Sequence, residues 1–352
     1  MTTTDHSVSS HGLLLTSITD FDAPLNETFH ALKRALLLCH RITLVVSISE
    51  SSSTKVSGSD YSNSNGALNK KAATSFHDVQ RFLSALYVSF SKHAQELLRP
   101  LAELDIVFQD TCGYKIGTGV ADEIPFHVLL GLPAVTKALA GINQERTKNG
   151  SKALPVYTLD LTPEREIHCH LVEDMDSTVA HSKIHEGEYE NVVLGGTFDH
   201  LHAGHKILLS MTAWIASKRV VCGVTDDSML QSKKYKEELE SLNTRVDAVK
   251  RFLRAFKRSL VIEVVPIHDI YGPTATDTNI QAIMVSKETL KGGEAVNKER
   301  DSRGLSQLAI EVIDVISPTE TAVDEVHLKI SSTYIRQYLA EQRSKTTAPA
   351  KE

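Results

Sequence analysis

The sequence is poor in cysteine, and its four cysteines stand apart from one another. No two form a CxxC pair, so we expect neither a disulfide framework nor a zinc ribbon, and a reducing compartment fits best. Long apolar runs are missing too, since runs such as ALLLC and ITLVV fall far short of the roughly 20 residues that cross a bilayer. No lysine or arginine precedes Lys33, so the start lacks the features of a secretory signal or a mitochondrial presequence. We therefore expect a cytoplasmic protein with no membrane partner.

An excess of positive charge is also absent. Lysine and arginine number 38 against 44 aspartates and glutamates, which gives a formal net charge of −6 and a pI near 6.2. This balance argues against nucleic acid as a partner, although a local basic patch can still hold an anionic small molecule. The 352 residues are 41% hydrophobic and 23% charged, which is an ordinary globular composition and long enough for two domains.

The first half of the chain, residues 1–188, is expected to be an α/β region of unknown role. Its residues 47–65 (SISESSSTKVSGSDYSNSN) are nearly half serine, so we predict a disordered Ser-rich insertion near residues 47–75. Residues 27–48 indicate a helix followed by a strand, and residues 76–98 show a helical repeat of apolar positions. The serine tract therefore interrupts a folded unit. No catalytic motif is evident in this half, which leaves protein partners as a possible role for it.

After residue 188 the pattern changes to short β-branched runs that alternate with amphipathic helices. The strands are expected over residues 192–195, 219–224, 260–265, 282–285 and 310–315. Because these runs are mostly apolar on both faces, they suit a parallel sheet covered by helices. We predict a doubly wound, Rossmann-like α/β domain over residues 189–342, followed by a flexible tail at 343–352. Ligands of such folds bind at the carboxyl ends of the strands.

The stretch GGTFDHLHAGH follows the first of these strands. Gly195 and Gly196 end the strand and let a ligand approach the backbone closely. The segment HAGHKILLSMTAWI predicts a helix in which His202 and His205 lie on one face near the N-terminus, with Gly204 between them. One such glycine or histidine alone indicates only a turn or a cap. Together with the free amides of a helix N-terminus, they predict an anion site.

A second motif, KISSTYIRQYL, begins at Lys329. Ser331, Ser332 and Thr333 are good N-cap residues, so a helix is expected to begin there, with Arg336 one turn inside it. This arrangement suits a polyphosphate tail. Taken alone, it is more typical of an ordinary cap with a solvated arginine.

Two lysine-rich segments follow other strands. Lys233 and Lys234, in QSKKYKEEL, are placed to meet a phosphate, and a solvated helix face is the alternative. The segment VSKETLKGGEAVNKER brings Lys287 near the expected sheet edge. Here we favour a charged surface loop with a turn at Gly292 and Gly293.

The combination of GGTFDHLHAGH, which contains the HxGH signature, with ISSTYIR is similar to the nucleotidylyltransferase superfamily. The wider likeness, including GVTDDSMLQSKKY and VSKETLKGGEAVN, resembles phosphopantetheine adenylyltransferase of the eukaryotic type over roughly residues 191–339. The resemblance implies transfer of the adenylyl group of ATP to 4′-phosphopantetheine, giving dephospho-CoA and pyrophosphate in coenzyme A biosynthesis. Some eukaryotic relatives also carry a dephospho-CoA kinase. Its P-loop, GxxxxGK[ST], does not occur here, so we expect no second kinase activity.

The resemblance also implies roles for single residues. His205 would donate to the α-phosphate, Thr197 would help to place the reacting phosphate, and His202 would assist nucleotide binding. Further ATP-binding residues would be Gly195, Gly196, Phe198, Gly204, Ser331, Ser332, Thr333 and Arg336. Lys233, Lys234 or Lys287 would hold the acceptor phosphate. No protein metal ligand is implied, because ATP would carry the Mg²⁺. Bacterial relatives usually have an arginine after the fourth strand, where this chain has SKET, so that contact is in doubt.

Three other hypotheses stay open on the sequence. The chain can be a nucleotidylyltransferase for nicotinamide mononucleotide, flavin mononucleotide or phosphocholine, although the RTEGIS signature usual in the choline type is absent. A metal-dependent hydrolase would use His200, His202 and His205, but no further metal-ligand cluster stands out. The third hypothesis is a binding protein whose catalytic domain has decayed. The intact pair of motifs argues against it.

Overall fold

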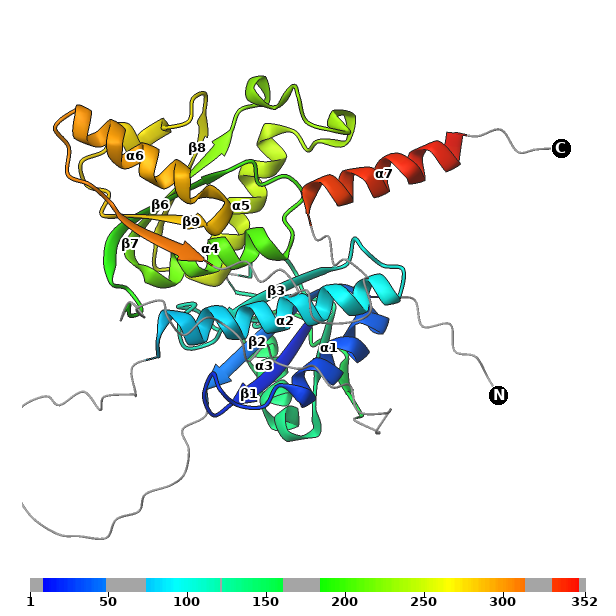
Figure 1. The fold of residues 1–352 in the computed structure, drawn as a ribbon. Helices are drawn as coiled ribbons and strands as arrows, with labels where there is room; N and C mark the ends of the chain where they lie inside the picture. The colour runs from blue at the N-terminus through cyan, green and yellow to red at the C-terminus, as the bar shows by residue number, and fades with distance from the viewer. Residues whose placement is uncertain (1–8, 49–73, 121, 161–183, 314–330, 348–352) are drawn as a thin grey trace, which may run out of the picture.

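The computed structural model describes residues 9–48, 74–120, 122–160, 184–313 and 331–347. These residues form two parallel five-stranded sheets, each covered by helices on both faces, in a Rossmann-like α/β arrangement (Figure 1). The predicted fold class is therefore confirmed for the second half, and the first half has the same architecture. No helix in the described ranges is long and apolar enough to cross a membrane.

The first sheet has the strand order β3-β2-β1-β4-β5. Its strands are β1 (Ser9–Ile18), β2 (Cys39–Ile48), β3 (Glu103–Phe108), β4 (Val128–Gly131) and β5 (Val156–Thr158). Helices α1 (Asn26–Leu38) and α2 (Phe76–Glu96) contribute to the core on one face, and η1 (Pro133–Val135) leads into α3 (Thr136–Lys148) on the other. The sequence patterns did not indicate β1, the central strand.

The second sheet has the order β10-β9-β6-β7-β8. Its strands are β6 (Tyr189–Gly196), β7 (Ala216–Thr225), β8 (Val261–Ile267), β9 (Ala282–Ser286) and β10 (Ala309–Ile313). Helices α4 (Ala203–Ile215) and α5 (Leu242–Phe256) pack on one face, α6 (Leu290–Ser302) packs on the other, and α7 (Ser332–Thr347) extends outward (Figure 1). Short 3-10 helices are η2 (Asp227–Leu230), η3 (Lys236–Glu238), η4 (Gly272–Ala275) and η5 (Lys287–Thr289). All five predicted strands are confirmed, the last of them as far as Ile313, since residues 314 and 315 lie outside the described residues.

The order of this sheet reverses at β6, which lies between β7 and β9. The chain leaves β6 toward α4 on one face and leaves β9 toward α6 on the other. At such a switch point the connections diverge, and a crevice opens outside the carboxyl ends of the strands. The fold therefore places Gly195 and Gly196 at the edge of the sheet where ligands of such folds bind.

The prediction of a surface loop at residues 285–300 is wrong, because most of this segment forms helix α6. Two glycines weaken a helix, but Gly293 lets α6 lie close to the sheet, where a Cβ would meet Val285 and Ile310 at 3.4 Å. Arg300 is buried and donates from Nη1 to the carbonyls of Thr274 and Asp277. Tertiary contacts thus override the local propensity.

The same contacts recur in α3 of the first half. Asn143 and Asn297 each bond the backbone N–H and C=O of a leucine 11 residues further on. Arg146 and Arg300 each donate from Nε to a carbonyl 6 residues further on. With the identical strand order, this makes the first half a second copy of the same topology. The segment around the start of its helix α1, residues 20–28, reads DFDAPLNET and carries no histidine.

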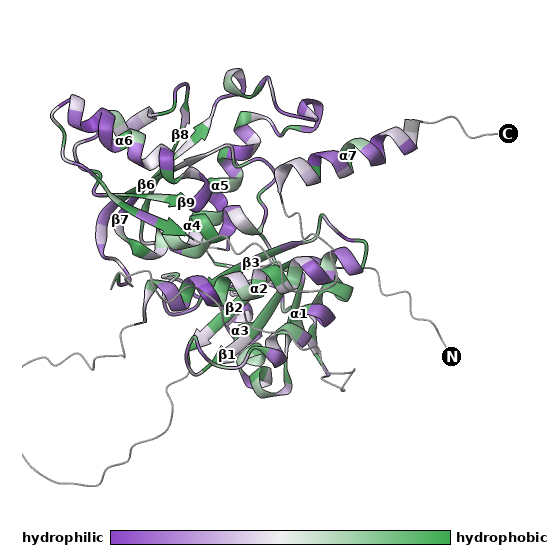
Figure 2. Ribbon diagram, in the orientation of Figure 1, coloured by the Kyte–Doolittle hydropathy of each residue, from purple (hydrophilic) through white to green (hydrophobic). Residues whose placement is uncertain are grey.

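The two halves share one hydrophobic core, in which α2 packs on α4. Ring centroids of Phe76 and Trp214 lie 6.3 Å apart across this contact, and those of Phe108 and Phe256 lie 5.9 Å apart. In Figure 2, α4, which packs on α2, is largely hydrophobic, whereas α7, which extends outward, is largely hydrophilic. The structure therefore joins the halves by burial of apolar surface.

Three boundaries predicted from the sequence can be compared with the structure. Of the predicted insertion at 47–75, Ser47 and Ile48 complete β2 and Ser75 caps α2, while residues 49–73 lie outside the described residues. The flexible tail predicted from residue 343 begins too early, since α7 continues to Thr347 and Arg343 pairs with Glu238 at 3.0 Å. β6 starts at Tyr189, and the domain boundary after residue 188 stays a prediction.

Candidate active site

The loop after β6 has an unusual backbone. Phe198 and His200 both have positive φ angles, of 52° and 45°, which residues other than glycine rarely adopt. A Cβ on Gly196 would lie 3.1 Å from the ring of the buried Phe198, so only glycine leaves that ring its place. Strain of this kind persists only where surrounding contacts impose it, and it is common at functional sites.

His202 and His205 stack at the start of α4. Their ring centroids lie 3.9 Å apart, and the ring of Phe198 lies 5.3 Å from that of His205. His202 occupies the N-cap position without making a side-chain cap bond. Both residues are partly accessible, but the Nδ1 atom of each is buried and has no hydrogen-bond partner. The two histidines meet near the helix N-terminus as predicted, but His202 is the N-cap with an extended backbone and does not lie within the helix.

Burial lowers the pKa of both imidazoles. Lys206, which follows His205 along α4, further lowers the pKa of His202. His202 in turn further lowers the pKa of His205. Both rings are therefore neutral near pH 7, and a neutral imidazole keeps one N–H to donate. The pair can give hydrogen bonds to an anion, beside the amides at the N-terminus of α4.

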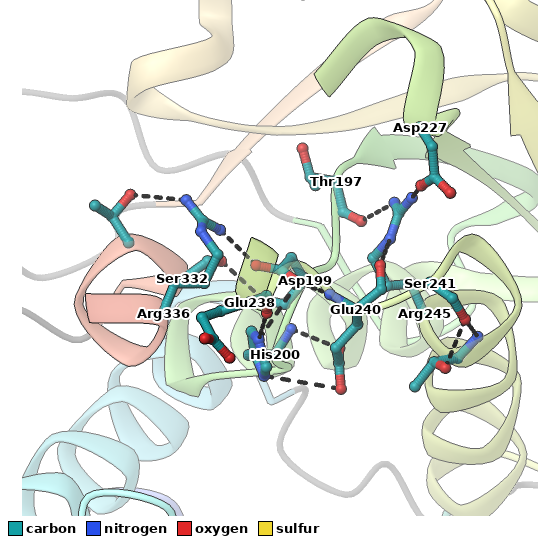
Figure 3. Close-up of polar contacts among 12 residues, drawn as sticks. Thr197, Asp199, His200, Asp227, Glu238, Glu240, Ser241, Arg245, Ser332 and Arg336 are labelled. Carbon is teal, nitrogen blue, oxygen red and sulfur yellow. Dashed lines mark hydrogen bonds and ion pairs between the residues drawn. The ribbon is translucent and has the colours of Figure 1, made fainter. Parts of the chain in front are cut away.

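Asp199 joins the two motifs found in the sequence (Figure 3). Its carboxylate is fully buried, accepts from Nη1 of Arg336 at 2.5 Å, and accepts from the amide of Glu240 at 2.9 Å. Its carbonyl accepts from Oγ of Ser332 at 2.8 Å. The start of α7 is therefore tied to the histidine loop, and the solvated-arginine interpretation of Arg336 is wrong.

The start of α7 is capped as the sequence predicts. Oγ of Ser331 accepts from the amide of Tyr334 at 3.3 Å. Arg336 donates from Nη2 to the hydroxyl of Thr333 at 3.2 Å and from Nε to the carbonyl of Lys234 at 3.0 Å. One arginine thus brings the serine-rich cap, the lysine segment and the histidine loop together.

A second buried arginine, Arg245 on α5, supports the same loop from the other side (Figure 3). Its Nη1 donates to the carbonyl of Thr197 at 2.7 Å and to that of Thr225 at 2.9 Å. Its Nη2 pairs with Asp227 at 2.5 Å and its Nε donates to the carbonyl of Glu240 at 3.0 Å. Arg245 therefore fixes the carboxyl ends of β6 and β7 relative to each other.

His200 does not join the other two histidines. Its Nε2 donates to the carbonyl of Glu238 at 2.7 Å, and its amide donates to the carboxylate of Glu240 at 2.7 Å. Across the part of the chain that the structure describes, no group of three or more His, Cys, Asp or Glu side chains is placed to hold a metal ion. The three-histidine ligand set that a hydrolase would need is not assembled there.

The three candidate lysines lie in different connections. Lys233 and Lys234 are exposed in the turn between η2 and η3, after β7. Lys287 begins η5, directly after β9, and β9 is the neighbour of β6. Lys234 is tied to the second motif through its carbonyl, which accepts from Arg336.

The sequence analysis missed the residues that hold the site together, namely Asp199 and Arg245. Asp199 lies inside the quoted motif but was given no role. Arg245 shares a face of α5 with the buried Val249 and Phe252, and a charged residue on an apolar face is a signal of a buried polar contact.

The chain is similar in sequence to proteins of known family. Residues 193–338 match the family model described as cytidylyltransferase-like. The chain is 42% identical over 183 residues to a phosphopantetheine adenylyltransferase of Saccharomyces cerevisiae, covering 52% of this chain and 58% of that protein. It is 40% identical over 148 residues to one of Methanopyrus kandleri, covering 42% of this chain and 89% of that protein. The chain thus spans little more than half of the yeast relative and most of the archaeal one.

Among solved structures, the chain is similar to a protein of unknown function from Archaeoglobus fulgidus. That likeness has a TM-score of 0.33 and 27% identity, and it covers 38% of this chain and 95% of the other.

Proposed function

The chain belongs to the phosphopantetheine adenylyltransferase family, and from this we propose that it transfers the adenylyl group of ATP to 4′-phosphopantetheine. The products are dephospho-CoA and pyrophosphate. The observation that carries the proposal is the stacked, neutral pair His202 and His205 at the start of α4, beside the crevice at β6 and the capped start of α7. Such a site suits an anionic nucleotide tail.

The reaction needs no protein base, because the acceptor phosphate is already a nucleophile. One of its oxygens attacks the α-phosphorus of ATP, and the bond from that phosphorus to the bridging oxygen of pyrophosphate breaks. Negative charge is redistributed over the phosphate oxygens in the transition state. The protein therefore acts by aligning the two phosphates and by donating hydrogen bonds to the charge that develops.

In this proposal His205 donates to the α-phosphate and His202 assists nucleotide binding. Their neutral state suits this role, since a neutral imidazole with one buried nitrogen presents its other nitrogen to a ligand. Thr197 follows β6, and Arg245 donates to its carbonyl at 2.7 Å, which supports the proposal that its backbone is held ready for the reacting phosphate. The strand-ending glycines leave room for the nucleotide.

The start of α7 is proposed to hold the β- and γ-phosphates. Ser331, Ser332 and Thr333 lie at its first turn, where amides point out of the helix. Arg336 is paired with Asp199, so we assign it chiefly to keeping α7 against the histidine loop. The positive charge of its guanidinium still favours a phosphate group nearby.

Lys233 and Lys234 are proposed to grip the acceptor phosphate. Both are exposed, and the contact from Arg336 to the carbonyl of Lys234 keeps this segment near α7. Lys287, at the carboxyl end of β9, is the alternative on the other side of the crevice.

Magnesium would enter on ATP. The carboxylate oxygens of Asp199 already accept from Arg336 and Glu240, and no three-residue ligand group is formed within the described ranges. Since Mg²⁺ keeps several waters and binds readily to substrate phosphates, this chain's residues fit a phosphate-borne ion. When bound, the ion would neutralise charge on the phosphates.

A direct assay tests the proposal. Purified protein with ATP, Mg²⁺ and 4′-phosphopantetheine should release pyrophosphate and form dephospho-CoA in equal amounts. Nicotinamide mononucleotide, flavin mononucleotide and phosphocholine serve as competing acceptors. If pyrophosphate were released with one of these compounds and not with 4′-phosphopantetheine, the proposed acceptor would be refuted. The reaction class, adenylyl transfer, would still hold.

A further inference from the structure

Lys206, the residue after His205, is buried in the contact between the two halves. Its Nζ donates to the carbonyl of Leu104 at 2.8 Å and to Oδ1 of Asp105 at 2.7 Å. Both acceptors belong to β3, the edge strand of the first sheet. A lysine is seldom buried without a partner, and here the partner comes from the half that carries no catalytic motif.

Asp105 is the centre of a buried ion cluster. Its other carboxylate oxygen accepts from Nη2 of Arg41 at 2.5 Å, and Arg41 also pairs with Glu103 at 3.2 Å. Burial by itself would raise the pKa of this carboxyl, but Lys206 and Arg41 outweigh it and hold the pKa well below its usual range. The carboxylate is therefore charged at neutral pH, and it gives Lys206 a strong and directional anchor.

The anchor acts on the first turn of α4. The amide of Lys206 donates to the carbonyl of His202 at 3.0 Å, so these two residues bracket that turn. His202 makes no side-chain cap bond, which means that the turn lacks the usual stabilisation of a helix N-terminus. Fixing Lys206 from outside the helix therefore restrains both histidine rings.

We propose that Asp105 is a positioning residue for the adenylyl transfer, holding Lys206 so that His202 and His205 keep the geometry that the reaction needs. The inference rests on the proposed function. It gives the first half of the chain a role in catalysis although its own copy of the fold lacks the histidines.

The alternative is that the cluster only stabilises the fold, and kinetics can separate the two. In Lys206→Met the cation is replaced by an apolar side chain of similar length, and Asp105 keeps Arg41. In Asp105→Asn the shape is kept and the anchoring charge is lost. We expect either change to lower kcat by about 10- to 100-fold in folded protein, the scale for misplaced reacting groups, with the KM for 4′-phosphopantetheine within about twofold. The double variant should lose little more than the singles.

A matched control breaks another ion pair between the halves. Arg258 of the second half pairs with Glu123 of the first at 2.6 Å, at the far end of α5 from the histidines. Glu123→Gln should leave kcat unchanged, whatever it does to stability. A loss of kcat in Glu123→Gln as large as in Lys206→Met would mean that any weakening of the interface suffices, and would overturn the assignment to Asp105.

A second measurement does not depend on the acceptor. Hydrogen exchange of peptides that cover residues 203–207, recorded without substrate, should be faster in Lys206→Met and Asp105→Asn than in wild type and Glu123→Gln. Unchanged exchange together with near-normal kcat would refute the proposal. If wild type transfers adenylyl to no acceptor, the proposed function fails, while the exchange rates still decide whether Asp105 holds this turn.

Discussion

At the residue scale, the site is built on neutral histidines and buried arginines. Burial lowers the pKa of His202 and His205, whereas Arg336 and Arg245 donate their hydrogen bonds to the protein's own carboxylates and carbonyls. The histidines that are proposed to donate hydrogen bonds to the substrate are thus different residues from the arginines that support the loop. This division allows changes in catalysis and in stability to be measured separately.

The first prediction concerns His205. If it donates to charge that develops on the α-phosphate, it contributes more to the transition state than to bound ATP. His205→Ala should lower kcat by roughly 10²-fold or more, while the affinity for ATP changes much less. Steady-state kinetics and equilibrium binding of ATP check this. The exposed His40, replaced by alanine, serves as a control, and a near-normal kcat in folded His205→Ala would show that the ring is only a helix-start residue.

The second prediction concerns the lysines. Because Lys233 and Lys234 are adjacent and exposed, either can cover for the other. The double change to alanine should raise the KM for 4′-phosphopantetheine by about 10-fold or more, the scale of one lost charge-assisted contact, with little effect on kcat. Initial rates over a range of acceptor concentrations give both constants. An unchanged KM would move the contact to Lys287.

At the element scale, α7 is held by the hydrogen bond from Ser332 to the carbonyl of Asp199, by the partly exposed pair of Arg343 with Glu238, and by the buried ion pair of Arg336 with Asp199. Removing one partner of such a pair strands a buried charge, which usually costs about 3–5 kcal/mol. Arg336→Met should therefore lower the free energy of unfolding by about that much, as measured by urea denaturation. Asp199→Asn combined with Arg336→Met should cost less than the sum of the two single changes.

A surface pair gives the contrast for this measurement. Arg303 and Glu299 lie one turn apart on α6, with Arg303 about half exposed, and their Nη2 to Oε1 distance is 2.6 Å. Exposed pairs of this kind contribute under about 1 kcal/mol. If Arg303→Met destabilised the protein as much as Arg336→Met, burial of the Asp199 pair would not be the cause of its effect.

The strands of the first sheet are joined by a buried histidine. Nδ1 of His11 donates to the carbonyl of Pro125, and its Nε2 is hydrogen-bonded to the hydroxyl of Thr43, from which it accepts when the ring is neutral. Burial, with Arg41 nearby, lowers the pKa of His11 to about 4. The neutral ring thus favours the folded state at pH values above the unfolded pKa of about 6.5, and this contribution is lost as the pH falls toward 4.

The fourth prediction follows from this titration. Between pH 7 and pH 4.5 wild type should lose on the order of 2 kcal/mol more unfolding free energy than His11→Gln, whose side chain does not titrate. Urea unfolding at the two pH values measures the difference. Equal losses in both proteins would mean that His11 titrates alike in the folded and unfolded states.

At the scale of the whole molecule, the two copies of the fold behave as one unit because they share a core. Trp214, the one tryptophan, lies on α4 against Phe76 of the first half and is 3% exposed. Its fluorescence reports the contact between the halves. We expect the urea transitions followed by fluorescence and by far-ultraviolet circular dichroism to coincide. A fluorescence change that precedes the loss of helix signal would show that the halves separate before either unfolds.

What the sequence determined by itself is local. Hydrophobic periodicity located the five strands of the second sheet, and the spacing of His202 and His205 placed both rings together at the start of a helix, because a helix or strand puts nearby residues in fixed relative positions. The cap at Ser331 followed from the same kind of short-range rule. Misreadings such as α6 arose where tertiary contacts outweigh the propensity of Gly292 and Gly293.

What only the tertiary structure decided are the contacts between distant segments. Asp199 and Arg336 are 137 residues apart in the chain, and Asp105 and Lys206 are 101 apart. No short-range pattern marks either pair, since each residue alone reads as an ordinary charged position. They meet because strand order and helix packing bring those parts of the chain together, and because a buried charge must find an opposite charge or a hydrogen bond there.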